Sequence, residues 1–241
     1  MKRIIVFLFF LLGMVGFTYA QKWEFGVEAG LFGNTGSNIA EGSGANFSGV
    51  WDAYESVYPA TNYKIGLFLR KNISKFYLGT GASINFNQQI DVTFKNIEPS
   101  DPNYGESYVK GYKIQTLSVP IVAGFHIYKG FGFQTGISVE FDVVNRKDSL
   151  NFPPVSDEVN AINNAFNNSY IRYTAGLFYQ YKRLRASFDY QRDLGWVVHY
   201  IHYTNNEQMH SETNLPIKIN SFVFTISYSL FSKKHQQTRI L

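Results

Sequence analysis

The stretch at residues 169–193, SYIRYTAGLFYQYKRLRASFDYQRD, decides the fold class. Successive side chains of a β-strand point to opposite faces, so odd and even positions separate the two faces. From Ile171 to Tyr181 every second residue is apolar, and most of the intervening residues are polar or glycine. The same alternation resumes at Leu184 and runs to Asp193 after a break of only a few residues. The stretch therefore predicts two antiparallel strands joined by a tight turn.

Similar strand-like runs fill the rest of the chain. The eight expected strands span residues 22–32, 62–71, 75–88, 110–128, 131–144, 169–182, 184–200 and 217–231. Short connections alternate with long ones, and the long ones span 33–61, 89–109, 145–168 and 201–216. Residues 157–167 are expected to form a short helix inside one of these loops. Tight turns at one end and long loops at the other are typical of an up-and-down antiparallel barrel.

Composition excludes the helical classes. The chain has 241 residues, of which 17% are aromatic and 17% charged, whereas globular proteins carry about 25% charged residues. Abundant Phe and Tyr with little Lys and Glu favour strands over helical bundles. A mean hydropathy of -0.16, with no long apolar run after residue 20, excludes a helical membrane protein. A membrane barrel stays compatible with these values because its strands alternate apolar and polar residues.

The bulk of the apolar face indicates where that face points. An eight-stranded barrel has little interior room, and six columns of Phe, Tyr, Ile and Leu would overfill it. We therefore expect these side chains to face lipid, with an interface girdle formed by Trp23, Tyr63, Phe76, Tyr128, Phe131 and Tyr181. The predicted fold is all-β, an eight-stranded antiparallel up-and-down transmembrane β-barrel. The alternative hypothesis is a periplasmic lipid- or ligand-binding barrel whose apolar face points inward.

The opposite face would then line the lumen, and it carries charges of both signs. The predicted lumen charge network consists of Glu24, Glu28, Lys64, Arg70, Glu140, Asp142, Arg172, Lys182, Arg185, Asp189 and Asp193. Buried charges need partners, so we predict a salt-bridged plug with a structural role and no open channel. A proton or substrate path is the alternative interpretation of these charges.

The first twenty residues have the pattern of a signal peptide. Lys2 and Arg3 precede an apolar run, and Ala20 is a small residue suited to cleavage; a retained N-terminal anchor is the alternative. We expect export to an outer membrane, a barrel at residues 21–231 and a polar, frayed tail at 232–241. Without Lys2 and Arg3 the chain keeps 20 basic and 18 acidic residues, and this balance gives no reason to expect nucleic-acid binding.

No motif predicts catalysis, a cofactor or a metal. His199 and His202 are three positions apart, so in a strand they point to opposite faces and chelate poorly, and His210 follows without an HExxH pattern. The absence of cysteine excludes thiolate sites. A barrel hydrolase that uses His199, His202 and Asp193 with Ser107 or Ser211 is the third hypothesis, although no GxSxG motif is present.

Pro120 interrupts the run TLSVPIVAGF at residues 116–125. Proline lacks a backbone N–H and is confined to edges and bulges of sheets. A closed barrel has no edge, so we expect a bulge or a weak seam at this position.

The segment YKIQTLSVPIVAGFHIYKGFGFQTGISVEF, residues 112–141, resembles the recurring core of the PorT-like outer-membrane β-barrel family of Bacteroidota. The matching residues are Leu117, Val119, Pro120, Ile121, Gly130, Gly132, Gly136 and Phe141. The opening WEFGVEAGLFG and the closing SFVFTISYSLF resemble the first and last strands of that family. One departure is the ten-residue tail beyond Phe231, because many barrel proteins end at a terminal aromatic residue.

The resemblance implies an eight-stranded barrel in the outer membrane and supplies no catalytic motif. Namesake members of the family assist a secretion and gliding machinery. We therefore expect a scaffold or accessory of a surface or secretion assembly. It would contact outer-membrane lipid, and it would contact other envelope or secretion-system proteins through the long loops 33–61 and 145–168, because loops on rigid scaffolds carry function.

Overall fold

The computed structural model describes residues 22–34, 45–47, 51–56, 61–144, 155–195, 197–204 and 210–232. The expected signal peptide at 1–20, and the expected tail apart from Ser232, lie outside the described residues. The strands are β1 (Lys22–Asn34), β2 (Ala45–Phe47), β3 (Trp51–Ser56), β4 (Thr61–Ile73), β5 (Phe76–Asn96), β6 (Ser107–Tyr128), β7 (Phe131–Asp142), β8 (Ser169–Tyr181), β9 (Leu184–Asp193), β10 (Val198–Thr204), β11 (His210–Ile217) and β12 (Asn220–Ser232). The described helix is α2 (Ser156–Ala165).

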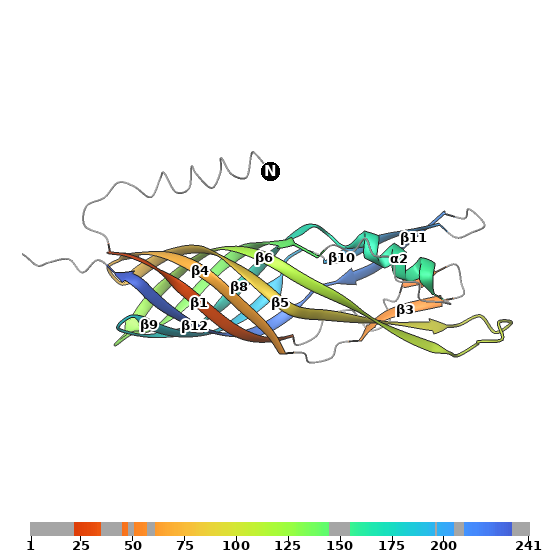
Figure 1. Cartoon of the computed structure of the whole chain (residues 1–241), viewed down its shortest axis with the longest axis horizontal. Coiled ribbons are helices and arrows are strands. Elements are labelled where there is room, and N and C mark those ends of the chain that lie inside the picture. Colours follow the sequence, from red (N-terminus) through yellow and green to blue (C-terminus); the bar gives the residue numbers. More distant parts are fainter. Residues whose placement is uncertain are drawn as a thin grey trace, which may run out of the picture.

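Antiparallel pairing joins the long strands into a ring (Figure 1). The order is β5-β4-β1-β12-β9-β8-β7-β6, and a further pairing of β5 with β6 closes it. The first and last strands of the chain lie side by side, with Ala29 opposite Ile226. Each strand of the ring is therefore paired with a neighbour on both of its edges.

Tight turns gather at one end of this ring, as the alternation of loop lengths predicts. The connections from β4 to β5, from β6 to β7 and from β8 to β9 each span two residues. Lys129 and Gly130 both have positive φ, at 40° and 88°. Two successive positive φ values are the mark of a type I′ turn, whose twist matches that of the flanking strands. We call this end of the ring the tight-turn end and the opposite one the loop end.

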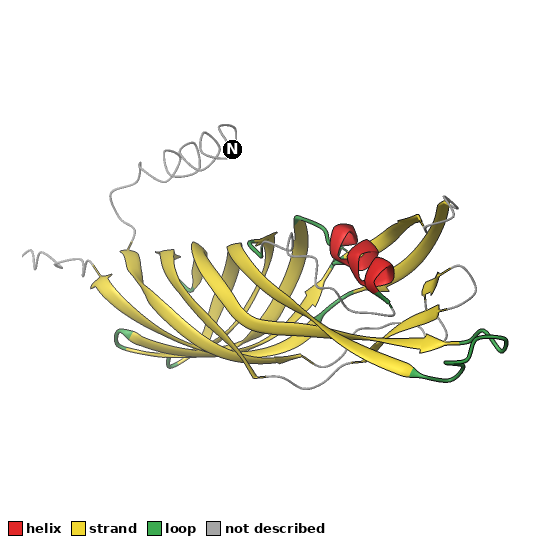
Figure 2. Ribbon diagram, turned by 45° about the vertical axis from the view of Figure 1, so that its right-hand side comes forward, coloured by secondary structure: helices red, strands yellow, loops and turns green. Residues whose placement is uncertain are grey.

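The loop end holds more regular structure than the sequence indicated. The strands β5 and β6 continue beyond the ring and meet at a turn over residues 97–106, so most of the expected loop at 89–109 is strand. The short strands β2 and β3 extend this arm, since β3 pairs with β5. The expected loop at 201–216 instead contributes to a hairpin of β10 and β11. Figure 2 shows these elements and α2 beside one another beyond the ring.

One expected strand boundary changes for a local reason, and the expected loop helix is found. The strand expected at 184–200 ends at Asp193, because Leu194 N–H turns back to the carbonyl of Ile171 and Val197 N–H bonds to Ile217. The short helix expected at 157–167 is present as α2.

The pairing of β5 with β6 is interrupted beside Pro120, where a disturbance was expected. The β5–β6 register passes from Thr80–Ile121 directly to Ser83–Ser118, so the pairs between them are missing from the ladder. Thr80 Oγ1 instead donates a hydrogen bond to the Pro120 carbonyl at 2.8 Å. Because proline offers no N–H to the neighbouring strand, the sequence prediction of a weak seam is confirmed.

The two faces of the ring differ as the alternation indicated. On the outer face each ring strand carries bulky apolar side chains that are 41–57% exposed, such as Val27, Ile65, Leu78, Ile121, Ile137, Leu177, Phe188 and Phe224. The inner face is polar: Glu24, Glu140, Arg172 and Asp193 are each 1% exposed. The interior of this ring is thus the reverse of an ordinary hydrophobic core.

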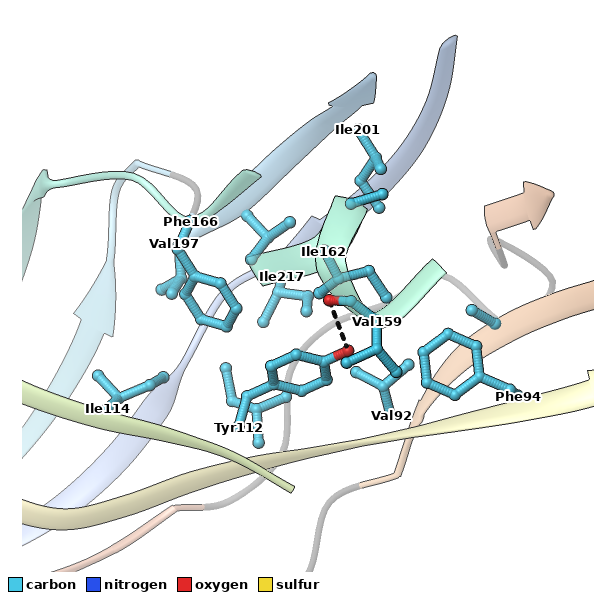
Figure 3. Close-up of a cluster of buried hydrophobic side chains, with 14 of the residues drawn as sticks. Val92, Phe94, Tyr112, Ile114, Val159, Ile162, Phe166, Val197, Ile201 and Ile217 are labelled. Carbon is cyan, nitrogen blue, oxygen red and sulfur yellow. Dashed lines mark hydrogen bonds between the residues drawn. The ribbon is translucent and has the colours of Figure 1, made fainter. Parts of the chain in front are cut away.

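A separate apolar cluster lies at the loop end, and the sequence analysis did not anticipate it. Figure 3 shows side chains from α2, β5, β6, β10 and β11 meeting there. Val159 and Ile162 of α2, Val92 of β5 and Ile201 of β10 are completely buried. The Tyr112 hydroxyl donates to the Val159 carbonyl at 3.5 Å. Buried residues of β2 and β3 belong to the same cluster, and we call this group of elements, with β2 and β3, the cap.

Candidate functional site: the polar interior of the ring

Strand register brings distant polar residues together inside the ring. Arg172 of β8 lies directly opposite Asp193 of β9, and Ser118 of β6 lies opposite Glu140 of β7. Because every second residue points inward, each strand contributes polar groups at several heights. The interior therefore divides into layers along its axis.

The layer nearest the loop end is built around two acids. Arg172 Nε lies 2.7 Å from Asp193 Oδ1, with both side chains almost completely buried. The second Asp193 oxygen accepts the backbone N–H of Ile219 at 2.9 Å. The carboxylate of Glu140 accepts four hydrogen bonds at 2.6–3.1 Å from Asn85, Thr116, Ser118 and Ser138. Both acids are thus satisfied by fixed neighbours, as buried carboxylates require.

The middle layer contains one ion pair beside a small cavity. Lys64 Nζ lies 2.7 Å from Glu28 Oε1. The adjoining cavity has a volume of about 80 Å³ and is lined by polar groups that include Arg70, Tyr77 and Asp189. Small-molecule sites are usually roughly 300–1,000 Å³ and mainly apolar. This cavity has room for a few water molecules, which polar walls can hold.

The layer nearest the tight turns combines arginines with aromatic rings. The guanidinium carbon of Arg185 lies 3.6 Å from the Phe178 ring centre and 4.4 Å from that of Tyr77. The Arg185 side chain also donates hydrogen bonds to Tyr77 and to Gln134. Arg70 lies 4.0 Å from the Phe68 ring centre. Cation–π contacts of this kind stabilise desolvated arginines.

Glycines make room for the three inward rings of that layer. A Cβ atom on Gly26 would lie 2.7 Å from the Phe68 ring, and one on Gly124 or Gly132 would overlap the ring of Tyr77 or Phe178. The inward glycines are thus required by close packing in a narrow lumen.

Most of the predicted lumen charges are brought together, but two are not. Glu24, Glu28, Lys64, Arg70, Glu140, Arg172, Arg185, Asp189 and Asp193 are inside the ring, buried or nearly so. Lys182 is exposed at the turn after β8, where its φ of 54° breaks the alternation. Asp142 is half-buried at the end of β7, and its carboxylate accepts the N–H of Val144 at 3.0 Å.

Neutral polar groups also take part in the lumen network, which the sequence did not indicate. The lumen contains the ion pairs Lys64–Glu28 and Arg172–Asp193. Asp189 instead accepts hydrogen bonds from Gln134 at 2.6 Å and from Ser187 at 2.9 Å. Neutral amide and hydroxyl groups thus bind a buried carboxylate where the sequence predicted an opposite charge. These groups could not be recognised in the sequence among the many other polar residues.

The hydrolase hypothesis stays a prediction, because the side chains of its histidines and of Ser211 lie outside the described residues. Asp193 is fully engaged by Arg172 and Ile219. His199 and His202 lie in β10, and His210 begins β11, opposite Thr204. Across the ranges that the structure describes, no group of three His, Cys, Asp or Glu side chains could hold a metal ion. No helix in those same ranges is long and apolar enough to cross a membrane.

Comparison with known proteins adds little. No family model matches the chain, and no curated protein matches it. Among solved structures, the chain is similar to the transport unit of the autotransporter AIDA-I from Escherichia coli, with a TM-score of 0.28 and 9% sequence identity, over 89% of this chain and 92% of that one. A likeness this weak does not place the two chains in one fold.

Proposed function

We propose that this chain is an eight-stranded transmembrane β-barrel of an outer membrane, related to the PorT-like family, with a polar, plugged lumen and no catalytic activity. In this proposal it acts as a scaffold or accessory of a surface or secretion assembly. The observation that carries the proposal is the inverted burial of the ring, with apolar side chains outside and ionised ones inside. Lipid is the solvent that favours this arrangement, because a continuous apolar belt in water would aggregate.

The interior supports a plug rather than a channel or a binding pocket. Its acids are held by fixed hydrogen bonds, its arginines are stacked on rings, and its cavity of about 80 Å³ suits water. The alternative of a periplasmic ligand-binding barrel requires an apolar interior, whereas the inward residues here are mostly polar.

The cap supports an interaction role for the loop end. It builds ordered elements into both long loops, 33–61 and 145–168, that we expect to contact other envelope or secretion-system proteins. α2 buries Val159 and Ile162 against the rest of the cap and leaves Asp157 and Asn164 exposed. A rigid base with exposed polar residues is what a loop-borne recognition surface needs.

Two experiments test the proposal. Outer-membrane fractionation and a heat-dependent shift in gel migration are expected for a folded membrane barrel, whereas recovery from the soluble periplasm would refute it. When expressed in cells that lack the protein, the loop variant Asp157→Lys/Asn164→Lys should fail to restore the function of the surface or secretion assembly. The lumen variant Glu140→Gln should restore it provided that it folds. The opposite pattern would favour a transport path through the lumen.

A further inference from the structure

The three tight turns, with the strand ends that they join, carry charge of a single sign. They contribute five basic residues: Lys71, Lys75, Lys129, Lys182 and Arg183. The segments that hold them, 71–76, 127–132 and 181–184, contain no acidic residue. Among the described residues, no carboxylate forms an ion pair with any of the five. Among the described residues, therefore, no carboxylate explains the position of these cations.

Three of these cations lie against aromatic rings. The ammonium of Lys71 is 5.4 Å from the Trp23 ring centre. The ammonium of Lys129 is 5.0 Å from the Tyr128 ring centre, and the ammonium of Lys182 is 5.1 Å from the Tyr181 ring centre. Tyr128 and Tyr181 are 65% and 58% exposed. Aromatic belts of membrane proteins lie at headgroup level, so these contacts place the ammonium groups at the depth of lipid phosphates.

The opposite end of the molecule does not share this pattern. Its described segments mix both signs: the acids Asp52, Asp91, Glu98, Asp101, Glu106 and Asp157 occur among the bases Lys95, Lys110, Lys113 and Lys218. A general excess of lysine therefore does not account for the basic tight-turn end. The asymmetry follows the axis of the ring.

We propose that the tight-turn end is a binding surface for anionic phospholipids, which it recognises through the phosphate-bearing headgroups of the leaflet at that end. This inference rests on the proposed membrane barrel. A lysine near an anionic membrane surface contributes about a fivefold gain in affinity. Several such residues around one rim give a lipid preference that neutral headgroups do not satisfy, and they favour the insertion in which this end meets the anionic leaflet.

The test uses the purified full chain in neutral detergent with equal amounts of phosphatidylglycerol and phosphatidylcholine of the same acyl chains. Native mass spectrometry counts the lipids retained. The unmodified protein should retain phosphatidylglycerol over phosphatidylcholine by at least about tenfold. The variant Lys71→Gln/Lys75→Gln/Lys129→Gln/Lys182→Gln should reduce that preference at least about tenfold. Inorganic phosphate should not displace the bound lipid, because a free anion lacks the acyl chains.

A matched control removes the same charge from the other end, with Lys95→Gln/Lys110→Gln/Lys113→Gln/Lys218→Gln. This variant should retain the preference of the unmodified chain. Equal retention of both lipids by the unmodified protein, or an equal loss in both variants, would overturn the inference alone. Failure of the unmodified chain to fold into phosphatidylcholine vesicles would overturn the barrel proposal and the inference with it.

Discussion

Leu177→Arg is the substitution that most directly tests whether the outer face of the ring contacts lipid. Leu177 lies on β8 and is 51% exposed. It is four residues from Tyr181, which belongs to the expected aromatic girdle. With a rise of about 3.3 Å per residue and a strand tilt of about 40°, this spacing places Leu177 roughly 10 Å inside the girdle. An apolar band about 25 Å tall has its midplane near that depth.

The expected loss follows from this depth. An arginine at the bilayer midplane of a membrane barrel costs about 2–4 kcal/mol, and one near the interface costs about 0–1 kcal/mol. Val109→Arg provides the matched control, since Val109 is 50% exposed but lies on the part of β6 beyond its last pair with β7, at Thr116. We expect Leu177→Arg to lower the free energy of unfolding by about 2–4 kcal/mol. Val109→Arg should change it by less than about 1 kcal/mol.

The assay is equilibrium unfolding by urea in phosphatidylcholine vesicles, with the folded fraction read from heat-dependent gel migration. An exposed position in water tolerates arginine within about 0.5 kcal/mol. A Leu177→Arg protein as stable as the unmodified chain would therefore show that the outer face of β8 is not in lipid, and the proposed function would fall.

Three further predictions concern the lumen and the cap. Arg172→Met leaves Asp193 buried without its ion pair and should lower the free energy of unfolding by about 3–5 kcal/mol. The double variant Arg172→Met/Asp193→Leu should recover most of this loss. A double variant no more stable than the single one would contradict the pairing. Gly124→Ala pushes a methyl group into the aromatic ring of Tyr77 and should destabilise the ring of strands by about 1–3 kcal/mol. Gly33→Ala is the control, because nothing lies within 4 Å of the new atom, and it should leave the same urea titration unchanged. Ile162→Ala removes a completely buried side chain from α2 and should destabilise the cap by about 2–5 kcal/mol. Proteolysis and amide exchange around α2 should become faster, while the heat-dependent gel migration of the ring stays unchanged. Loss of the α2 protection and of the heat-dependent migration together would show that cap and ring unfold as one unit.

The cap could have been anticipated in part from the sequence. Val155, Val159, Ile162 and Phe166 are spaced like one face of a helix, and all four are buried. In β5, a bulge between Asn85 and Gln88 shifts the buried positions from odd to even, and the alternation then runs past the expected strand end through Ile90, Val92 and Phe94. These signals indicate an apolar face on the helix and an extension of the strand. They do not indicate that the two meet, because that contact joins segments about 70 residues apart in a chain of 241 residues.

Sequence alone determined the features that depend on neighbouring residues. Alternation of apolar and polar side chains assigned the two faces of six of the ring strands, tight turns separated the two ends, and Pro120 marked the weak seam. Each of these follows from local backbone geometry, so one strand or one turn is enough to reveal it.

The tertiary structure decided what each inward group contacts. The pairing of Arg172 with Asp193, the four hydrogen bonds to Glu140 and the stacking of Arg185 on Phe178 depend on strand register around the closed ring. Register brought Gln134 and Ser118 into the predicted network, whereas the positive φ of Lys182 in its tight turn left that residue out of it. Polar side chains in a strand accept many partners, and the sequence does not rank them. The physical reason is that a shift of one residue in any strand reverses which side chains point inward, and the stagger between strands is fixed only when the ring closes.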